Sequence, residues 1–474
     1  MIRRTKIVAT LGPATDSPET LDMMVQAGVD VVRVNFSHGN VALHRRRIEA
    51  VRACAVRLGR QVGILVDLQG PKIRIAKFAE GSVLLDAGSC FAIDTEIPLS
   101  AGTSLEVGSE YPDLARDVLA GNILLLDDGR IALQVKKVSG ARIETEVLVG
   151  GRLSDNKGIN LKGGGLSARA LTAKDRQDIQ DAAALQVDYV AISFPRGADD
   201  ILEARRLLAE AGGTAGIIAK IERAEAVVNI HEIIEAADGV MVARGDLAVE
   251  IGDAEVPAIQ KQIIRLAGEL NKPVITATQM MESMIHSTVP TRAEVSDVAN
   301  AVLDGTDAVM LSAETAVGEY PAAVVTAVHR VCMAVEKQPA MCRSGHRINH
   351  SFERVDEVIA MTAMYAANHM NIKAIAAITA SGTTPLWMSR IRTATPIYGL
   401  SNQPIALGRM TLFRNVFPIA VEIDASDAGD IQAMAIALLI DRGLVQRGDY
   451  VILTKGDHPG VHGGANVMKI VVAE

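Results

Sequence analysis

Eight short apolar segments recur along the first two-thirds of the chain, and each ends in polar or glycine-containing residues before a helical pattern begins. Near-continuous apolar segments that alternate with helices are typical of parallel strands buried on both faces. Because a (β/α)8 or TIM barrel contains eight such units, the pattern predicts an α/β protein built on that barrel. A doubly wound open sheet is the alternative, since periodicity does not show whether a sheet closes. The expected strands begin at Lys6, Val31, Gly63, Tyr189, Gly216, Gly239, Val274 and Ala308.

The third and fourth predicted strands are separated by an interval that is too long for one helix. Its alternating segments, with a hairpin turn expected at Asp128-Gly129, predict a small β-barrel domain inserted as a lid. After the eighth unit, a polar stretch precedes a second set of strand and helix patterns. We therefore expect residues 1–70 and 169–343 to form the catalytic barrel, residues 71–168 the inserted β lid, and residues 344–474 a C-terminal α/β domain.

Composition limits the possible partners. The 474 residues are 49% apolar and 22% charged, which is typical of a soluble globular protein. A net charge of −8 and an aromatic content of 3% argue against a nucleic-acid partner. The four cysteines are scattered, which predicts free thiols in a reducing compartment. With no signal-like N-terminus and no apolar segment near the roughly 18 residues of a membrane span, we expect a cytoplasmic protein without membrane contact.

Lys220 and Glu222 lie at the end of the fifth predicted strand. Residues two apart in an extended backbone point the same way, so the ammonium and the carboxylate share one side. Asp246 ends the next strand and is expected beside Glu222. Two carboxylates with room for water and ligand oxygens suit Mg²⁺ or Mn²⁺, and a nearby lysine adds positive charge where an oxyanion can develop. A plain ion pair is the alternative interpretation of the Lys-Ile-Glu tripeptide.

Gly245 separates Arg244 from Asp246, and a residue without a side chain lets the backbone approach a ligand. Free amides at the start of the following short helix would bind an anion. Thr278 ends the seventh predicted strand, and its hydroxyl is expected to contact a substrate carboxylate or to help move a proton. The alternatives are an exposed adhesion-type Arg-Gly-Asp loop and, for Thr278, a helix N-cap. Glu314 follows the eighth strand on the same expected face.

The second predicted strand places three polar side chains, Arg33, Asn35 and Ser37, on one side. Arg33 is suited to a phosphate or carboxylate, and Arg74 adds a second cation near the lid. Asp67 ends the third strand at the same rim. Together these residues predict an anionic, phosphate-bearing substrate held on a divalent metal ion.

Seven motifs then occur in one order: RVNFSHG, VDLQGPKIR, NKGINL, AKIE, MVARGDLAVEI, TATQMMESM and DGTDAVMLSAETAVGEYP. They resemble the pyruvate kinase family, and the resemblance runs from the first strand into the C-terminal domain. It implies transfer of the phosphoryl group of phosphoenolpyruvate to ADP, giving pyruvate and ATP in the last step of glycolysis. It also implies a barrel, a lid inserted after the third strand and a C-terminal effector domain, assembled as a homotetramer.

The resemblance also implies roles for individual residues. Glu222 and Asp246 would hold Mg²⁺ or Mn²⁺, and Lys220 would stabilise the transferring phosphoryl group and the enolate. The substrate would contact Arg33, Lys220, Gly245, Asp246 and Thr278, with Lys220, Thr278 and Arg33 as the catalytic residues. Thr278 would act through water in protonating the enolate. The nucleotide would contact Asn35, Phe36, Ser37, His38, Arg74 and Lys157, although a histidine such as His38 is by itself more often structural.

One departure concerns the monovalent cation. Family members that need potassium carry Thr, Lys and Glu where this chain has Leu68, Gln69 and Lys72. Their potassium site corresponds to Asn35, Ser37, Asp67 and Leu68. Because Lys72 brings its own positive charge to this region, the resemblance to the potassium-independent branch predicts that potassium is not required.

In the C-terminal segment, Thr379, Ser381, Gly382, Thr383 and Thr384 lie between a predicted strand and a helix. Hydroxyls and amides at a helix start suit a phosphate, and ordinary N-capping is the alternative. The resemblance favours an allosteric site for a phosphorylated metabolite.

Two rival functions remain for the whole chain. A metal-dependent lyase or aldolase would need no lid and no nucleotide residues. A phosphometabolite sensor without catalysis would have no need of the intact set Lys220, Glu222, Asp246 and Thr278.

Overall fold

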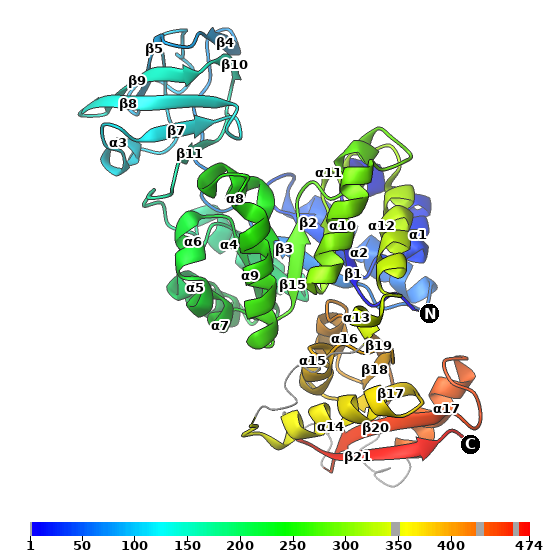
Figure 1. The fold of residues 1–474 in the computed structure, drawn as a ribbon. Helices are drawn as coiled ribbons and strands as arrows, with labels where there is room; N and C mark the ends of the chain where they lie inside the picture. Colours follow the sequence, from blue (N-terminus) through cyan, green and yellow to red (C-terminus); the bar gives the residue numbers. More distant parts are fainter. Residues whose placement is uncertain (1, 343–350, 423–430, 458–463) are drawn as a thin grey trace.

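The computed structural model describes residues 2–342, 351–422, 431–457 and 464–474. The chain is arranged in three parts along one axis, with the inserted β strands at one end and the C-terminal sheet at the other (Figure 1). The expected domain boundary between residues 343 and 344 lies outside the described residues.

The central part is a closed parallel barrel, so the predicted fold class is confirmed and the open-sheet alternative is wrong. The strand order is β1-β16-β15-β14-β13-β12-β3-β2, and all eight strands were expected from the sequence. Their bounds are β1 (Lys6–Thr10), β2 (Val31–Asn35), β3 (Gly63–Asp67), β12 (Tyr189–Ile192), β13 (Gly216–Ile221), β14 (Gly239–Ala243), β15 (Val274–Ala277) and β16 (Ala308–Leu311).

Helices surround the barrel and bury their apolar faces against it (Figure 1). Several begin at side-chain caps, for example at Thr291, which accepts the backbone N–H of Glu294 in a capping box. The longer helices are α1 (Pro18–Ala27), α2 (Val41–Arg57), α4 (Ala173–Ala184), α5 (Ala198–Glu210), α7 (Ile230–Ala236), α8 (Arg244–Ile251), α9 (Val256–Glu269), α10 (Arg292–Asp304) and α12 (Pro321–Val335). Short turns complete the layer: η1 (Pro13–Thr15), α6 (Ala224–Val228), η2 (Glu282–Ile285), α11 (Ala313–Ala316) and α13 (Pro339–Cys342).

A repeated aspartate ties the strands together at the amino-terminal end of the barrel. Each of these aspartates immediately precedes a strand, and its carboxylate accepts a backbone N–H at the start of the neighbouring strand. The polar contact satisfies a buried amide and fixes the register of the strand pair. The four pairs are Asp30 with Ile7 (2.9 Å), Asp188 with Ile64 (2.7 Å), Asp238 with Ile217 (2.7 Å) and Asp307 with Val274 (3.0 Å).

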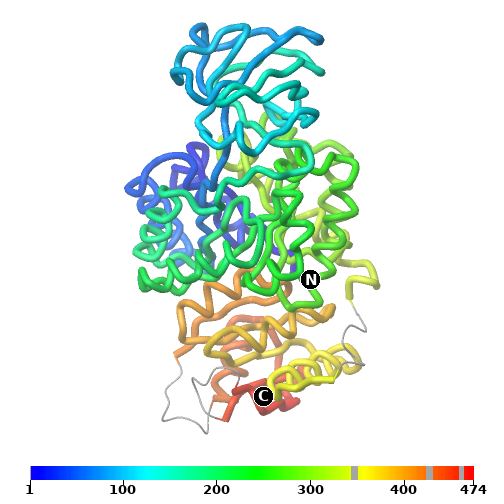
Figure 2. The backbone as a smooth tube through the Cα atoms, turned by 90° about the vertical axis from the view of Figure 1, so that its left-hand side faces the viewer, coloured from blue at the N-terminus to red at the C-terminus, as the bar shows by residue number. Residues whose placement is uncertain are grey.

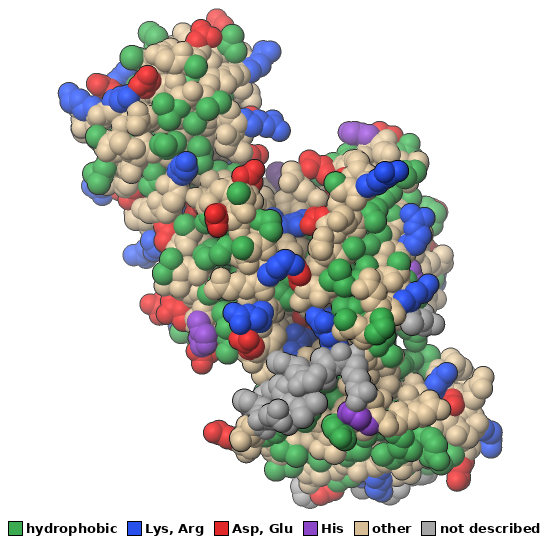
Figure 3. Space-filling model, in the orientation of Figure 1, with side chains coloured by type: hydrophobic (Ala, Val, Ile, Leu, Met, Phe, Trp, Pro, Cys, Tyr) green, Lys and Arg blue, Asp and Glu red, His purple; other side chains and the backbone are tan. Residues whose placement is uncertain are grey.

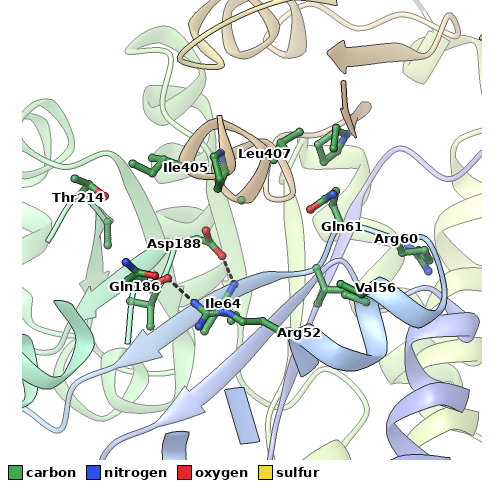
Figure 4. A pocket seen from close by; sticks show the side chains of 18 of the residues that line it. Arg52, Val56, Arg60, Gln61, Ile64, Gln186, Asp188, Thr214, Ile405 and Leu407 are labelled. Atoms are coloured by element: carbon green, nitrogen blue, oxygen red, sulfur yellow. Dashed lines mark hydrogen bonds between the residues drawn. The ribbon is translucent and has the colours of Figure 1, made fainter. Parts of the chain in front are cut away.

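Asp188 differs from the other three aspartates in its charge partner. Asp30, Asp238 and Asp307 each form an ion pair, with Arg3, Arg205 and Arg390 respectively. Within the described residues, Asp188 has no cation at ion-pair distance. Burial raises its pKa from 3.8 to about 6, and Arg52 and Arg409 oppose that shift only in part. Its side chain lines a cavity of about 1050 Å³ between the barrel and the C-terminal sheet (Figure 4).

The inserted segment has its own apolar core and stands away from the barrel (Figure 2). Asp127 and Asp128 have positive φ angles of 51° and 55° in the hairpin between β7 and β8, which confirms the expected turn. One sheet has the order β11-β7-β8-β9-β5-β6 and a second pairs β10 with β4, so the insert consists of two sheets and not of the single small β-barrel that was expected. The bounds are β4 (Ser82–Leu85), β5 (Cys90–Asp94), β6 (Glu106–Val107), α3 (Leu114–Asp117), β7 (Ile123–Leu126), β8 (Ile131–Ser139), β9 (Arg142–Val149), β10 (Gly151–Ser154) and β11 (Ile159–Leu161).

The C-terminal part is a five-stranded sheet of order β19-β18-β17-β20-β21, in which β21 alone runs antiparallel to its neighbour. All five strands were expected from the sequence. Their bounds are β17 (Ile372–Ile378), β18 (Ile397–Ser401), β19 (Val416–Ala420), β20 (Tyr450–Gly456) and β21 (Ala465–Val472), with helices α14 (Val355–His369), α15 (Thr383–Ser389), α16 (Pro404–Met410) and α17 (Ile431–Asp441).

The surface in Figure 3 carries acidic and basic side chains interspersed over all three parts. Within the described ranges, every helix is too short or too polar to cross a lipid bilayer.

Asp188→Asn tests the uncompensated carboxylate. The raised folded pKa means that protonated Asp188 stabilises the fold at low pH, and this contribution is lost as the pH rises through about 6. Asparagine keeps the neutral form at every pH and can still accept the Ile64 N–H. We expect the variant to gain stability over the wild type as the pH rises from about 4 to about 6, with a constant difference of about 1–2 kcal/mol above pH 7, measured by chemical unfolding.

The matched control is Asp238→Asn, which removes a carboxylate that is already paired with Arg205. That variant should be less stable than the wild type at pH 8. A difference between Asp188→Asn and the wild type that does not change with pH would contradict the assignment.

Candidate active site

The carboxyl ends of the barrel strands bring together a buried lysine and several carboxylates. Lys220 Nζ lies 2.9 Å from Glu222 Oε1 and 3.2 Å from Asp67 Oδ1. Lys220 and Glu222 therefore share one side of the chain, as the spacing predicted, while Ile221 packs into the layer between barrel and helices. Burial lowers the pKa of Lys220, but the carboxylates of Asp67 and Glu222 outweigh burial and the net shift is upward.

Asp67 links Lys220 to Arg33. Its side chain is 1% exposed, and Oδ2 accepts a 2.6 Å hydrogen bond from Arg33 Nε. Burial alone would raise the pKa of Asp67, but the two cations hold it below its usual range. Arg33 Nη1 also donates to Thr10 Oγ1 at 3.1 Å. The guanidinium is thus fixed at the rim of the barrel by two strands.

Glu222 is a buried carboxylate whose pKa is raised. Burial raises its pKa to about 7, Lys220 opposes that shift, and the nearby charge of Asp246 adds to it. Its Oε2 accepts the backbone N–H of Phe194 at 2.9 Å. The repulsion between Glu222 and Asp246 supports their predicted proximity.

Asp246 lies in the first turn of α8 and is paired with Lys72, whose Nζ is 3.4 Å from Oδ1. Its side chain is 27% exposed, so it remains open to a ligand. Among the described residues, the structure contains no cluster of three or more His, Cys, Asp or Glu side chains suited to a metal ion. Glu222 and Asp246 would therefore supply two protein ligands, with the others from water or substrate.

Thr278 is not a helix N-cap, so that alternative is wrong. It has a φ of +76° and Gln279 a φ of +55°, after which the chain enters the short turn η2. A positive φ is strained for a β-branched residue and is found where function requires it. A Cβ on Gly245 would lie 2.9 Å from Thr278 Cγ2, so this glycine lets the two strand ends meet.

Arg244 points away from this cluster. Its guanidinium pairs with Asp297 at 2.7 Å and donates to the carbonyls of Ala277 and Thr278 at 3.0 and 2.6 Å. It anchors the segment that carries Thr278, which does not fit an exposed adhesion loop. Glu314 is also structural, because its carboxylate accepts the backbone N–H groups of Met281 and Ser312.

The expected nucleotide residues of the second strand lie at the same rim. Asn35 Oδ1 accepts the Ser37 N–H at 3.0 Å, and His38 is exposed. Phe36 is buried and stacks on His44 with ring centroids 4.2 Å apart. Its N–H donates to the Asp67 carbonyl at 2.9 Å, and its carbonyl accepts from Lys174 Nζ at 2.8 Å.

Arg74 and Lys157 lie in two segments of the insert that run side by side, where Arg74 forms an isolated β-bridge with Gly158. Arg74 Nη1 donates to the carbonyl of Asn156 at 2.8 Å, and Lys157 pairs with Asp127 at 2.7 Å. Both are thus carried by the insert and not by the barrel. Leu68 is buried, with 1% exposure.

The hydroxyl groups of the expected effector loop contact one another. Thr379 Oγ1 accepts the N–H of Gly382 at 2.9 Å, and Ser381 Oγ lies 2.8 Å from Thr383 Oγ1. Gly382 has a φ of +82° and Thr384 is buried. The N-cap of α15 is Gly382, and no side-chain capping hydrogen bond is made from that position.

Sequence reasoning missed two residues, Ser193 and Phe194. Ser193 Oγ accepts a 2.7 Å hydrogen bond from Lys220 Nζ, and the Phe194 N–H holds Glu222. The segment YVAISFP was identified as the fourth strand, and its polar residue at the carboxyl end was the available signal.

The fold is that of a barrel enzyme, with a buried lysine and carboxylates clustered at the carboxyl ends of its strands. Models of known families give the same class: "Pyruvate kinase, barrel domain" matches residues 2–325, and "Pyruvate kinase, alpha/beta domain" matches residues 357–471. The chain belongs to the pyruvate kinase family, whose members are glycolytic phosphotransferases.

Named relatives agree over the whole length. The chain is 53% identical to pyruvate kinase II of Salmonella typhimurium over 478 residues, covering 100% of this chain and 99% of that protein. It is 50% identical to pyruvate kinase of Haemophilus influenzae over 477 residues, with the same coverage. Identity to pyruvate kinase of Geobacillus stearothermophilus is 42% over 478 residues, covering 100% of this chain and 81% of that protein.

Proposed function

We propose that this chain transfers the phosphoryl group of phosphoenolpyruvate to ADP at the carboxyl end of the barrel. The observation that carries the proposal is the buried ammonium of Lys220, held between Asp67 and Glu222 where the strand ends converge. Phosphoryl transfer depends mainly on positioning and on neutralising charge. Lys220 supplies a fixed positive charge for the phosphoryl oxygens and for the enolate that remains.

Mg²⁺ or Mn²⁺ fits the acidic pair. Glu222 and Asp246 offer oxygen ligands, and their mutual repulsion is the kind that a cation relieves. Two protein carboxylates suit Mg²⁺, which usually keeps water or substrate oxygens as its other ligands. Bound there, the ion would add positive charge beside Lys220.

The substrate's acidic groups have matching partners around this pair. Arg33 would hold the phosphate, since its guanidinium is already fixed on Asp67. Gly245, Asp246 and Thr278 would hold the carboxylate end, because the bare backbone at Gly245 allows close approach. The strained backbone at Thr278 favours a functional hydroxyl, acting through water in protonation of the enolate.

The nucleotide would lie between the barrel and the insert. Asn35, Phe36, Ser37 and His38 form the barrel side, and Arg74 and Lys157 the insert side. Because the two sides belong to different parts of the chain, closure of the insert as a lid would complete the nucleotide site.

The remaining assignments rest on the family. We propose barrel, lid and C-terminal units at residues 1–70 with 169–343, 71–168 and 344–474, assembled as a cytoplasmic homotetramer. A phosphorylated effector would bind the loop of Thr379, Ser381, Gly382, Thr383 and Thr384 and regulate the barrel allosterically.

Lys220→Met tests the catalytic assignment. Methionine fills similar space without charge, and Asp67 keeps its partner Arg33, so folding should be retained. Pyruvate formation from phosphoenolpyruvate with ADP and Mg²⁺ should fall by roughly three orders of magnitude, as losses of a positive charge at a transferring phosphoryl group commonly do. A coupled spectrophotometric assay measures pyruvate formation, and circular dichroism measures whether the fold is retained.

The control is Lys272→Met, which removes a lysine that binds the Glu235 carbonyl at the other end of the barrel. Near-normal turnover in Lys220→Met would refute the role of Lys220. Turnover by the wild type without ADP would instead favour the lyase, and saturable binding without any turnover would favour the sensor.

Potassium should not be required. Lys72 Nζ lies 3.4 Å from Asp246, which places a built-in monovalent charge beside the proposed metal ligand. We expect wild-type activity in tetramethylammonium chloride within about twofold of that in potassium chloride at equal ionic strength, so that Debye screening is matched. Lys72→Glu should make activity depend on potassium, whereas Lys77→Glu, an exposed change in the insert, should not. A wild type that is inactive until potassium is added would overturn this proposal.

A further inference from the structure

Ser193 occupies a central place among the charged residues of the site. It directly follows β12, is 1% exposed, and lies between the ends of β3 and β13. Its Oγ accepts a 2.7 Å hydrogen bond from Lys220 Nζ and donates a 2.6 Å hydrogen bond to the carbonyl of Leu68. The hydroxyl therefore connects the lysine to the backbone of the neighbouring strand.

The ammonium of Lys220 has three protons and three acceptors. These acceptors are Ser193 Oγ at 2.7 Å, Glu222 Oε1 at 2.9 Å and Asp67 Oδ1 at 3.2 Å. All three ammonium protons already face an acceptor in the protein. Lys220 can therefore contact a substrate oxygen only if it loses one of these three contacts. Glu222 is the acceptor that a divalent ion would engage, and Asp67 is shared with Arg33.

We propose that Ser193 is a positioning residue that keeps Lys220 aimed into the site when Glu222 binds the metal ion. This inference rests on the proposed roles of Lys220 and Glu222. Of the three acceptors, the serine hydroxyl is the neutral one, so it orients the ammonium without neutralising the charge that the substrate needs. Ser193 acts through Lys220 and does not touch the reacting groups.

The surroundings of Ser193 fix its orientation. Its hydroxyl donates to the Leu68 carbonyl at 2.6 Å, while the other acceptor, Asp67 Oδ1, is more distant at 3.5 Å, so the oxygen lone pairs remain for Lys220. Leu68 is itself held by a 3.1 Å hydrogen bond from its N–H to the carbonyl of Ala191. A Cβ on Gly70 would lie 2.7 Å from the Cβ of Ser193, so the bare backbone at Gly70 packs directly against the serine.

The next residue holds the other member of the charged pair. The N–H of Phe194 donates to Glu222 Oε2 at 2.9 Å, and Phe194 has a φ of +56°. Such a conformation is strained in a residue other than glycine and persists where the surroundings impose it. The dipeptide Ser193-Phe194 thus orients Lys220 by a side chain and Glu222 by a backbone amide.

Ser193→Ala tests the proposal. Removing the hydroxyl frees the ammonium to shift while leaving the proposed ligands of substrate and metal in place. We expect kcat for pyruvate formation to fall about 10- to 100-fold, as loss of orientation does. The KM for phosphoenolpyruvate and the Kd for Mn²⁺, measured by electron paramagnetic resonance without substrate, should each change less than threefold.

Two further variants sharpen the result. Ser193→Cys preserves the shape of the side chain but offers only a weak hydrogen-bond acceptor, so its kcat should fall as well. This variant tests the same contact if Ser193→Ala folds poorly. Thr306→Val removes a buried hydroxyl at the opposite end of the barrel and should leave kcat unchanged.

Wild-type kcat in Ser193→Ala or Ser193→Cys would overturn the proposal. Two other results would also overturn it. A rise in KM without a fall in kcat would show that Ser193 contributes to substrate binding. A tenfold weaker Mn²⁺ affinity would show that Ser193 acts on Glu222. Absence of turnover in the wild type would instead count against the proposed function.

Discussion

The site depends on a buried ammonium that is surrounded by acceptors from three adjacent strands. A lysine in this position would lose its charge through desolvation if it were alone. Asp67 from β3, Ser193 after β12 and Glu222 after β13 keep it protonated and fix its direction. The same contacts leave Glu222 with an unfavourable negative charge close to Asp246. The charged cluster is therefore suited to a divalent cation and an anionic substrate.

The closed barrel makes this arrangement possible. Strand β3 is far from β12 and β13 in the sequence but is the neighbour of β12 in the sheet, and parallel pairing brings the carboxyl ends of all three to one rim. At the opposite rim, four aspartates fix the register of alternate strand pairs. One-residue slips in that register would turn Lys220 and Asp67 away from each other. The barrel strands are only four to six residues long. The register that the aspartates fix at one end of the barrel therefore sets the positions of the site residues at the other end.

Much of this could be predicted from local pattern. Apolar segments and their polar ends identified all eight barrel strands, and the period of two in a strand placed Lys220 beside Glu222. The family resemblance added the expected nucleotide and effector residues. Ser193 was not found, because a serine after a strand is common and its contact with Lys220 depends on sheet closure. The pairing of Lys72 with Asp246 and the positive φ of Thr278 are likewise set by tertiary packing, which periodicity does not contain.

The most direct measurement is the anomalous scattering of a crystal of this protein soaked in Mn²⁺. The carboxylates of Glu222 and Asp246 repel each other in the free protein, and the ion should bind to both. We therefore predict one strong peak bonded to Glu222 and Asp246, with Lys220 Nζ still hydrogen-bonded to Ser193 Oγ. A peak elsewhere on the barrel, or none between these two side chains at saturating Mn²⁺, would contradict the account.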